Sequence, residues 1–114
     1  MTSYVGITSR LKAMGHPVRL QILDMLRSGE ICVCHIQRAL NRRQAYISQQ
    51  LMTLRDAGLV TSRKDGLQVY YRLADDEITE LLHVLYGPPR SDGIPMLDNC
   101  NCPACSTALI TDIA

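Results

Sequence analysis

Residues 33–73 read VCHIQRALNRRQAYISQQLMTLRDAGLVTSRKDGLQVYYRL, and this stretch decides the fold. Its first part predicts a short helix that ends at Asn41 in a left-handed cap. A longer helix follows the turn 41–43, and Gly58 ends it. The apolar positions of the two helices have helical spacing: Ile36, Ala39 and Leu40 in the first, and Ile47, Leu51, Leu54 and Ala57 in the second.

The next residues change from helical to strand character. Segments 59–63 and 68–73 are rich in β-branched and aromatic residues and flank Lys64-Asp65-Gly66. An Asp-Gly pair between two such segments predicts a β-hairpin. The order of helix, turn, helix and basic hairpin is that of a winged helix–turn–helix, so we expect a mainly α fold with a small β-hairpin.

Helical spacing also surrounds this central stretch. We expect helices over 9–14, 17–26 and 76–85, because apolar residues recur there at helical intervals and Gly or Pro residues follow each segment. Little periodicity remains beyond Gly87-Pro88-Pro89. The chain therefore divides into a winged helix–turn–helix domain over residues 1–86, which binds DNA and dimerises, and a Cys-containing C-terminal tail over residues 87–114.

In a winged helix–turn–helix the second helix enters the major groove, where every base pair has its own pattern of donors and acceptors. Arg42 and Arg43 at the start of this helix suit phosphate contacts, and Arg63 and Lys64 in the hairpin suit the backbone or the minor groove. The alternative is an ordinary solvated helix face beside a generic hairpin. Five positions of the second helix are expected to face outward: Gln44, Ala45, Tyr46, Ser48 and Gln49.

The charges of the chain are divided along its length. Residues 1–73 carry eleven basic and four acidic residues, a net charge of +7, whereas residues 74–114 carry a net charge of −6. A basic half on a nearly neutral chain indicates a surface for a polyanion, or else an ordinary solvated surface. No apolar run approaches the roughly 20 residues that span a bilayer, and the first residues lack a secretion signal. We therefore expect a cytoplasmic protein with no membrane partner.

The five cysteines are clustered, as Cys32 and Cys34 and then as Cys100, Cys102 and Cys105. In a reducing compartment a structural disulfide framework is not expected. On a regular helix Cys32 and Cys34 would point about 200° apart, whereas an extended segment places them on one side. If they share an ion, the helix that follows must therefore begin irregularly. An ion bound there would distort the support of the second helix and so change its fit to DNA.

Three separated motifs resemble the ArsR–SmtB family of metal- and metalloid-responsive repressors. These are LKAMGHPVRLQIL at 11–23, EICVC at 30–34 and LMTLRDAGLV at 51–60, followed by the basic hairpin. The resemblance implies a homodimer in which the first and last helices, around 4–14 and 76–86, pack across the two-fold axis. It also implies repression of a detoxification or efflux operon without the ion and release from DNA when the ion binds.

The chain departs from the family pattern in several places. Arg43 and Gln50 stand where the family often has Ser or Thr and His, so the operator sequence does not carry over. The last helix lacks the spacing of the family's zinc site, and no zinc is expected there. Many arsenic-responsive relatives have a third cysteine at the position of Gln37. The third ligand must then come from elsewhere in this chain.

Arsenic(III) and antimony(III) favour three thiolates, whereas Cd(II), Pb(II) or Zn(II) accept three or four. We therefore expect Cys32 and Cys34 to be joined by at least one of Cys100, Cys102 and Cys105, although the tail cysteines could also form a three-thiolate site alone. Arsenite or antimonite is the favoured inducer, and Cd(II) or Pb(II) the alternative. His35 could add a ligand, but a solvated histidine at a helix start is the more common outcome.

Other functions compete with ion sensing. The same cysteines could instead make an oxidation- or persulfide-sensing repressor. A thiol oxidoreductase is not favoured, because only nine residues follow the C-x-x-C spacing of 102–105. No phosphate loop, carboxylate pair or Ser–His arrangement is evident, so we expect no enzyme, no organic cofactor and no small organic substrate. The predicted partners are double-stranded operator DNA, with an imperfect inverted repeat, and a second copy of the chain.

Overall fold

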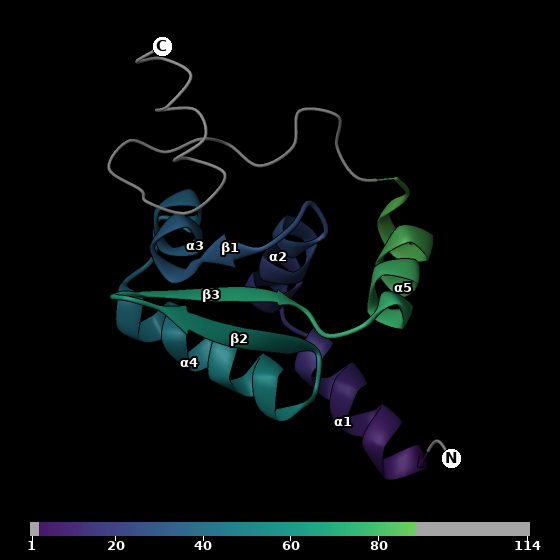
Figure 1. Cartoon of the computed structure of the whole chain (residues 1–114). Coiled ribbons are helices and arrows are strands. Elements are labelled where there is room, and N and C mark those ends of the chain that lie inside the picture. The colour runs from purple at the N-terminus through teal and green to yellow at the C-terminus, as the bar shows by residue number, and fades with distance from the viewer. Residues whose placement is uncertain (1–2, 89–114) are drawn as a thin grey trace.

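The computed structural model describes residues 3–88, and residues 1–2 and 89–114 lie outside that description. Over this range the fold is mainly helical with one small sheet, as predicted. Figure 1 shows α2, α3 and α4 gathered around the sheet, with α1 and α5 at the end away from the hairpin turn. The elements are α1 (Tyr4–Met14), α2 (Pro17–Leu26), β1 (Ile31–Cys32), α3 (Val33–Leu40), α4 (Gln44–Asp56), β2 (Val60–Asp65), β3 (Gln68–Leu73) and α5 (Asp76–Tyr86).

Side-chain caps explain where several helices begin. The Ser3 hydroxyl accepts hydrogen bonds from the first turn of α1, so this helix starts at Tyr4 rather than at residue 9, where the apolar pattern begins. His16 Nδ1 accepts from the Val18 amide at 3.2 Å and caps α2, whose first residue is proline. The Asp75 carboxylate caps α5 in the same way.

Residues with a positive φ end α3 and make the turn of the hairpin. Asn41 has φ 53° and ψ 50°, which confirms the predicted left-handed cap of α3. The hairpin pairs Asp65 with Gln68, which leaves a two-residue loop of Gly66 and Leu67. Gly66 has φ +63°, a conformation that side chains with a Cβ rarely adopt. The predicted hairpin is thus confirmed, with a loop that starts at Gly66, one residue after the Asp65 that pairs in the ladder.

The sheet has one more strand than the sequence predicted. Its order is β1-β3-β2 and both pairings are antiparallel. Strand β1 has only two residues, with Ile31 opposite Tyr71 and Cys32 opposite Tyr70. A two-residue strand is too short to show alternation, and its partner lies about 40 residues further along the chain, so local periodicity could not reveal it.

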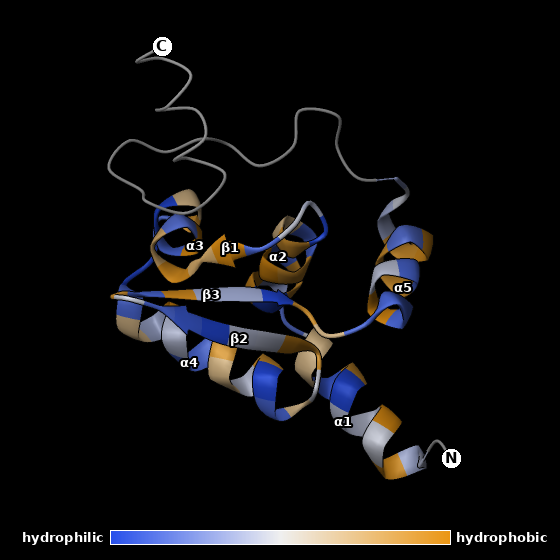
Figure 2. Cartoon of the chain, viewed as in Figure 1, coloured by the Kyte–Doolittle hydropathy of each residue, from blue (hydrophilic) through white to orange (hydrophobic). Residues whose placement is uncertain are grey.

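Aliphatic side chains fill the core, as the shortage of aromatic residues requires. Tyr71 is the aromatic member of the buried cluster. Figure 2 shows hydrophobic and hydrophilic residues alternating along the helices, as expected for helices that bury one face. None of the helices in residues 3–88 combines the length and the apolar character needed to span a bilayer. The largest fully buried apolar side chains come from most of the elements: Ile22, Leu23, Ile31, Ile36, Ile47, Leu51, Leu54, Leu59 and Leu82.

Replacing Leu51 by Ala should lower the free energy of unfolding by about 2–5 kcal/mol, because it leaves a cavity in a fully buried site of α4. Met52, the next residue, is 53% exposed, and Met52→Ala is the matched control. We expect that control to change stability by less than about 0.5 kcal/mol. Both variants should be unfolded in denaturant at one protein concentration, and equal losses would contradict the assigned orientation of α4.

Candidate nucleic-acid interface and thiol site

Helix α4 presents its first turns to solvent. Gln44, Ala45 and Gln49 are exposed, as predicted for residues that reach base edges. Tyr46 and Ser48 are only half-exposed, because Tyr46 also packs against the core. The Tyr46 ring can thus pack against the core with one edge and expose its other edge to solvent. The structure thus brings all five predicted positions to the start or middle of one helix, with different degrees of exposure.

The start of α4 is suited to an anion. Arg43 is the N-cap residue and supplies no side-chain hydrogen bond to the first turn, which also contains no acidic residue. The amide groups of a helix start carry partial positive charge and bind phosphate groups readily. Arg42 and Arg43 are both exposed beside this end, and the Arg42 guanidinium lies 5.5 Å from the centre of the Tyr46 ring. The start of α4 therefore combines two exposed guanidinium groups with backbone amides that no side chain caps.

A buried polar contact behind α4 was not predicted. Arg19 donates from Nε to Gln50 Oε1 at 2.8 Å and from Nη1 to the Ala13 carbonyl at 3.3 Å. Gln50 is buried, so this contact fixes α4 to α2 and to the end of α1. The available signal was a polar residue three positions after Ile47, on the apolar face of the helix. Arg19, itself half-buried, therefore helps to fix the orientation of α4.

The hairpin of β2 and β3, which is the wing of this fold, holds Arg63 in a defined position. Arg63 lies two residues before Asp65, the last residue of β2, and its guanidinium sits 4.6 Å from the centre of the Tyr70 ring. Arg63 also donates to both carboxylate oxygens of Glu30, at 2.6–3.0 Å. Hydrogen bonding to Glu30 raises the pKa of Arg63. Lys64, the other predicted wing residue, is exposed and projects from the opposite face of the strand.

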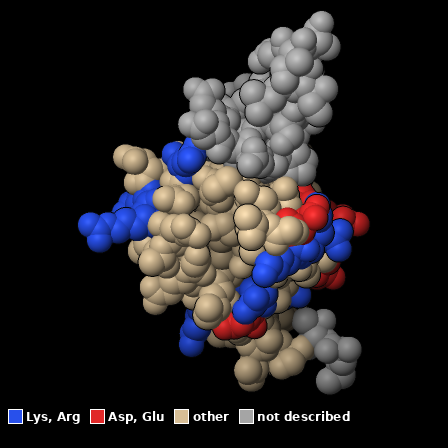
Figure 3. All heavy atoms as spheres, turned by 60° about the vertical axis from the view of Figure 1, so that its left-hand side comes forward, with Lys and Arg blue, Asp and Glu red and all other residues tan. Residues whose placement is uncertain are grey.

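The surface around the wing turn and the α3–α4 turn carries mixed charge. Figure 3 brings this end of the molecule forward, with Lys and Arg at two margins of a largely uncharged face. On one margin Asp and Glu lie among the basic residues. The basic half predicted from the sequence is therefore not a uniform positive patch. The acidic residues within it lie close enough to arginines to form ion pairs.

The two cysteines of the EICVC motif lie at a junction between strand and helix. Cys32 ends β1 with an extended backbone (φ −80°, ψ 158°), and Cys34 lies in the first turn of α3. Their Sγ atoms are 2.9 Å apart, well beyond the 2.05 Å or so of a disulfide. Cys32 is fully buried and Cys34 half-buried. The change of backbone between them meets the geometric condition for a shared ion.

Other predicted ligands are placed differently. His35 is fully buried in α3, so the expectation of a solvated histidine is wrong. The reason is that α3 buries both His35 and Ile36 against the rest of the domain. Cys100, Cys102 and Cys105 lie outside the described residues. Among residues 3–88, no group of three His, Cys, Asp or Glu side chains is arranged to hold a metal ion.

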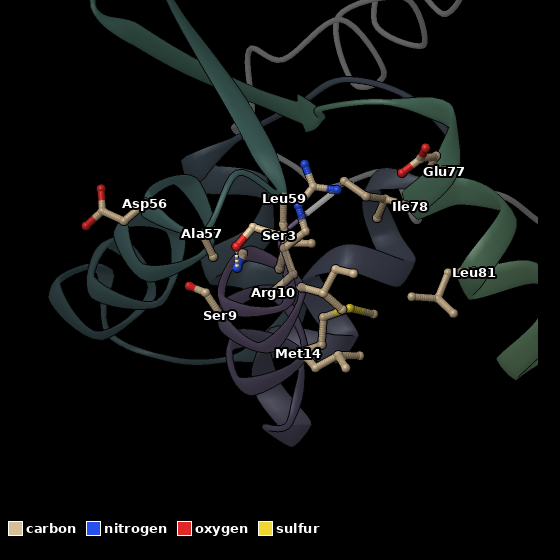
Figure 4. Close-up of a pocket in the computed structure, with 13 residues that line it drawn as sticks. Ser3, Ser9, Arg10, Met14, Asp56, Ala57, Leu59, Glu77, Ile78 and Leu81 are labelled. Atoms are coloured by element: carbon tan, nitrogen blue, oxygen red, sulfur yellow. Dashed lines mark hydrogen bonds between the residues drawn. The ribbon is translucent and has the colours of Figure 1, made fainter. Parts of the chain in front are cut away.

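Helices α1 and α5 border an open cavity of about 640 Å³. Figure 4 shows Met14 from α1 and Ile78 and Leu81 from α5 around it, with Arg10 in its middle. Arg10 also forms an ion pair with Asp75 at 3.5 Å. Several large apolar side chains of the two helices are exposed: Tyr4, Val5, Ile7, Leu11, Leu81, Val84, Leu85 and Tyr86.

A helix–turn–helix with two exposed arginines at the start of its second helix and a hairpin wing defines a winged helix–turn–helix DNA-binding protein. The family described as "Bacterial regulatory protein, arsR family" matches residues 16–62. The chain belongs to this arsR family. Its relatives are transcriptional regulators that bind operator DNA, and they are not enzymes. The predicted family, fold and DNA partner are thus confirmed.

Three comparisons support the assignment. The chain is 42% identical over 76 residues to the biofilm growth-associated repressor of Agrobacterium fabrum, spanning 67% of this chain and 65% of that protein. Two structures of HlyU from Vibrio cholerae, one described as reduced, are 40% identical, with TM-scores of 0.67 and 0.66. They match 74% of this chain and 95% and 92% of theirs. A homodimeric winged domain from Mycobacterium bovis is 34% identical, with a TM-score of 0.67, over 70% of this chain and 74% of that one.

The sulfur separation predicts that Cys32 and Cys34 act as one dithiol. In a variant with Cys100, Cys102 and Cys105 replaced by Ser, we expect one equivalent of phenylarsine oxide to bind tightly, because that reagent bridges neighbouring thiols. Adding Cys34→Ser should abolish this binding, whereas Ser28→Ala, a change at an exposed residue before β1, should preserve it. Titration followed by mass spectrometry measures both, and failure of the tail variant to bind would contradict a usable dithiol.

Proposed function

We propose that this protein is a homodimeric transcriptional repressor that leaves its operator when a thiophilic ion binds Cys32 and Cys34. Arsenite or antimonite is the favoured inducer, and Cd(II) or Pb(II) the alternative. The observation that carries the proposal is the 2.9 Å separation of the two sulfur atoms at the junction that precedes the helix–turn–helix. The resemblance to a family of metal- and metalloid-responsive repressors supports the same reading.

Ligation would change the shape of this junction. With metal–sulfur bonds of about 2.3 Å, two thiolates on one ion stand roughly 3.3–3.8 Å apart, the smaller value for a pyramidal ion and the larger for a tetrahedral one. The sulfur atoms would therefore have to separate by roughly 0.4–0.9 Å from the distance seen here. Helix α3 starts between the two cysteines and packs against α4. A shift at the start of α3 would thus be passed to the recognition helix, since packed interiors do not absorb displacements.

Two thiolates leave a pyramidal arsenic(III) site incomplete. The position of the third cysteine in many relatives holds Gln37 here. We assign the missing ligand to the tail, to one or more of Cys100, Cys102 and Cys105. Arsenic(III) or antimony(III) needs one of them, whereas Cd(II) or Pb(II) can use two.

The proposed dimer pairs α1 and α5 of one subunit with those of the other. These helices expose large apolar side chains beside the 640 Å³ cavity, and a monomer rarely leaves such side chains together in water. The homodimeric relative from Mycobacterium bovis supports this arrangement. Two recognition helices related by a two-fold axis would enter successive major grooves about 34–36 Å apart.

Redox sensing is the second candidate, and the same sulfur pair favours it. A disulfide would bring the sulfur atoms from 2.9 Å to about 2.05 Å, a movement opposite to that of ion binding. The relative HlyU is described in a reduced form, which supports thiol oxidation as a variable in this family. Oxidation of Cys32 and Cys34 would also disturb the start of α3.

The deciding experiment is a binding assay with the full chain and a duplex selected from a random-sequence pool. Fluorescence anisotropy follows release by sodium arsenite, by cadmium and by hydrogen peroxide in parallel, with the reduced protein as the start. We expect release at near-stoichiometric arsenite, and the triple tail variant should require far more. Release by peroxide alone would favour redox sensing, and an unchanged arsenite response in the tail variant would contradict the tail ligands.

Substitutions at the start of α4 should separate affinity from sequence preference. Arg43→Ala removes a predicted phosphate contact, so affinity should fall for all sequences and the salt slope should decrease by about one. Gln44→Ala should mainly relax the preference at one base position. Arg55→Ala, at the exposed opposite end of α4, is the matched control. Equal effects of Arg43→Ala and Arg55→Ala would contradict the assigned interface.

A further inference from the structure

The wing arginine is already occupied by a carboxylate. Arg63 uses Nε and Nη2 on the two oxygens of Glu30, and its Nη1 lies 3.6 Å from Asp65 Oδ2. Its guanidinium group also lies over the Tyr70 ring. The Arg63 side chain is still 50% exposed and that of Glu30 only 24%. The donors that would hold a phosphate are the same donors that hold Glu30, so the two anions compete for one guanidinium.

Glu30 and Cys32 belong to the same short stretch of backbone. Residues two apart in an extended segment point to the same side, and Glu30 immediately precedes strand β1, which ends at Cys32. Cys32 lies opposite Tyr70 in β3, and Tyr70 lies opposite Arg63 in β2. Directly opposed residues of antiparallel strands share a face and contact one another. A thiol, a ring and the wing guanidinium thus form one row across the sheet.

Cys34 reaches the next row of the same face. Its Sγ atom lies 3.9 Å from Gln68 Oε1, and Gln68 pairs with Asp65 at the end of the wing. Both thiols therefore lie beside hairpin residues on the face of the sheet that carries Tyr70. Strand β1 pairs with β3 over only two residues, which makes it the strand of this sheet that is held by the fewest ladder bonds. Chemistry at Cys32 and Cys34 acts directly on this strand.

We propose that Glu30 competes with DNA phosphate for Arg63, and that strand β1 makes this competition depend on the state of Cys32 and Cys34. The coupling rests on the proposed function, while the competition itself does not. In the unmodified protein DNA phosphate has to displace Glu30 from Arg63. When the thiols are modified, β1 shifts with Cys32 and holds Glu30 on Arg63, so the wing does not gain its phosphate contact. Glu30 is a positioning residue in this scheme, because it acts on DNA only through Arg63. This coupling acts on the wing through β1. It is separate from the coupling under "Proposed function", which acts on α4 through α3.

The test compares Glu30→Gln with Asp65→Asn in the full chain. Both changes remove one negative charge that faces Arg63, but only Glu30 holds it through several hydrogen bonds. On the selected duplex, Glu30→Gln should bind about two- to fivefold more tightly than Asp65→Asn, the range expected for an exposed ion pair. In an Arg63→Ala background, Glu30→Gln should give no such gain, as a double-mutant cycle requires. Anisotropy titrations at one salt concentration measure all five proteins.

Sodium arsenite then tests the coupling. The ratio of dissociation constants with and without arsenite should fall by at least about half in Glu30→Gln and stay at the wild-type value in Asp65→Asn. Equal affinities of the two variants, or a gain that persists without Arg63, would overturn the competition. An unchanged ratio in Glu30→Gln would overturn the coupling. If arsenite leaves wild-type binding unchanged, the proposed function and the coupling both fail, whereas the comparison without arsenite still decides the competition.

Discussion

Burial of one face of α4 is the constraint on which the rest of the structure depends. Ile47, Leu51 and Leu54 are fully buried, and they fix the rotation of the helix about its axis. Once that face is inside, the opposite face with Gln44 and Gln49 has to meet solvent. The Arg19–Gln50 contact adds a directional restraint to this apolar packing. In the proposed interface, affinity for DNA would therefore depend on the core, because the core sets which side chains of α4 are presented to solvent.

The junction between β1 and α3 connects this core to thiol chemistry. One backbone segment has to be extended at Cys32 and helical at Cys34, and this change of conformation brings the two sulfur atoms together. On one side of this junction β1 pairs with β3 of the wing, and on the other side α3 packs against α4. A change in the separation of the two sulfur atoms would thus act on two packed neighbours, the hairpin and α4, and both belong to the proposed DNA interface.

Residues with strong local patterns were predictable from the sequence, and residues that depend on distant partners were not. The periodicity of α4, the left-handed Asn41 and the Gly66 turn were all correctly assigned, because each depends on neighbours within a few residues. Strand β1 was missed because two residues carry no period. The burial of His35 and the Glu30–Arg63 pair depend on tertiary packing. Arg63 itself was predicted from the sequence as a wing residue, but its pairing with the Glu30 carboxylate was not.

The sulfur geometry also explains why one pair of cysteines could serve two kinds of signal. Ion binding requires the sulfur atoms to separate, and a disulfide requires them to approach, so the starting distance of 2.9 Å lies between the two end states. Either movement displaces Cys32 relative to β3, because β1 is held by a two-residue pairing. Discrimination between the signals then has to come from outside the pair, from whether further thiolates complete an ion site. In this chain those thiolates would have to come from the cysteines of the tail, since Gln37 offers none.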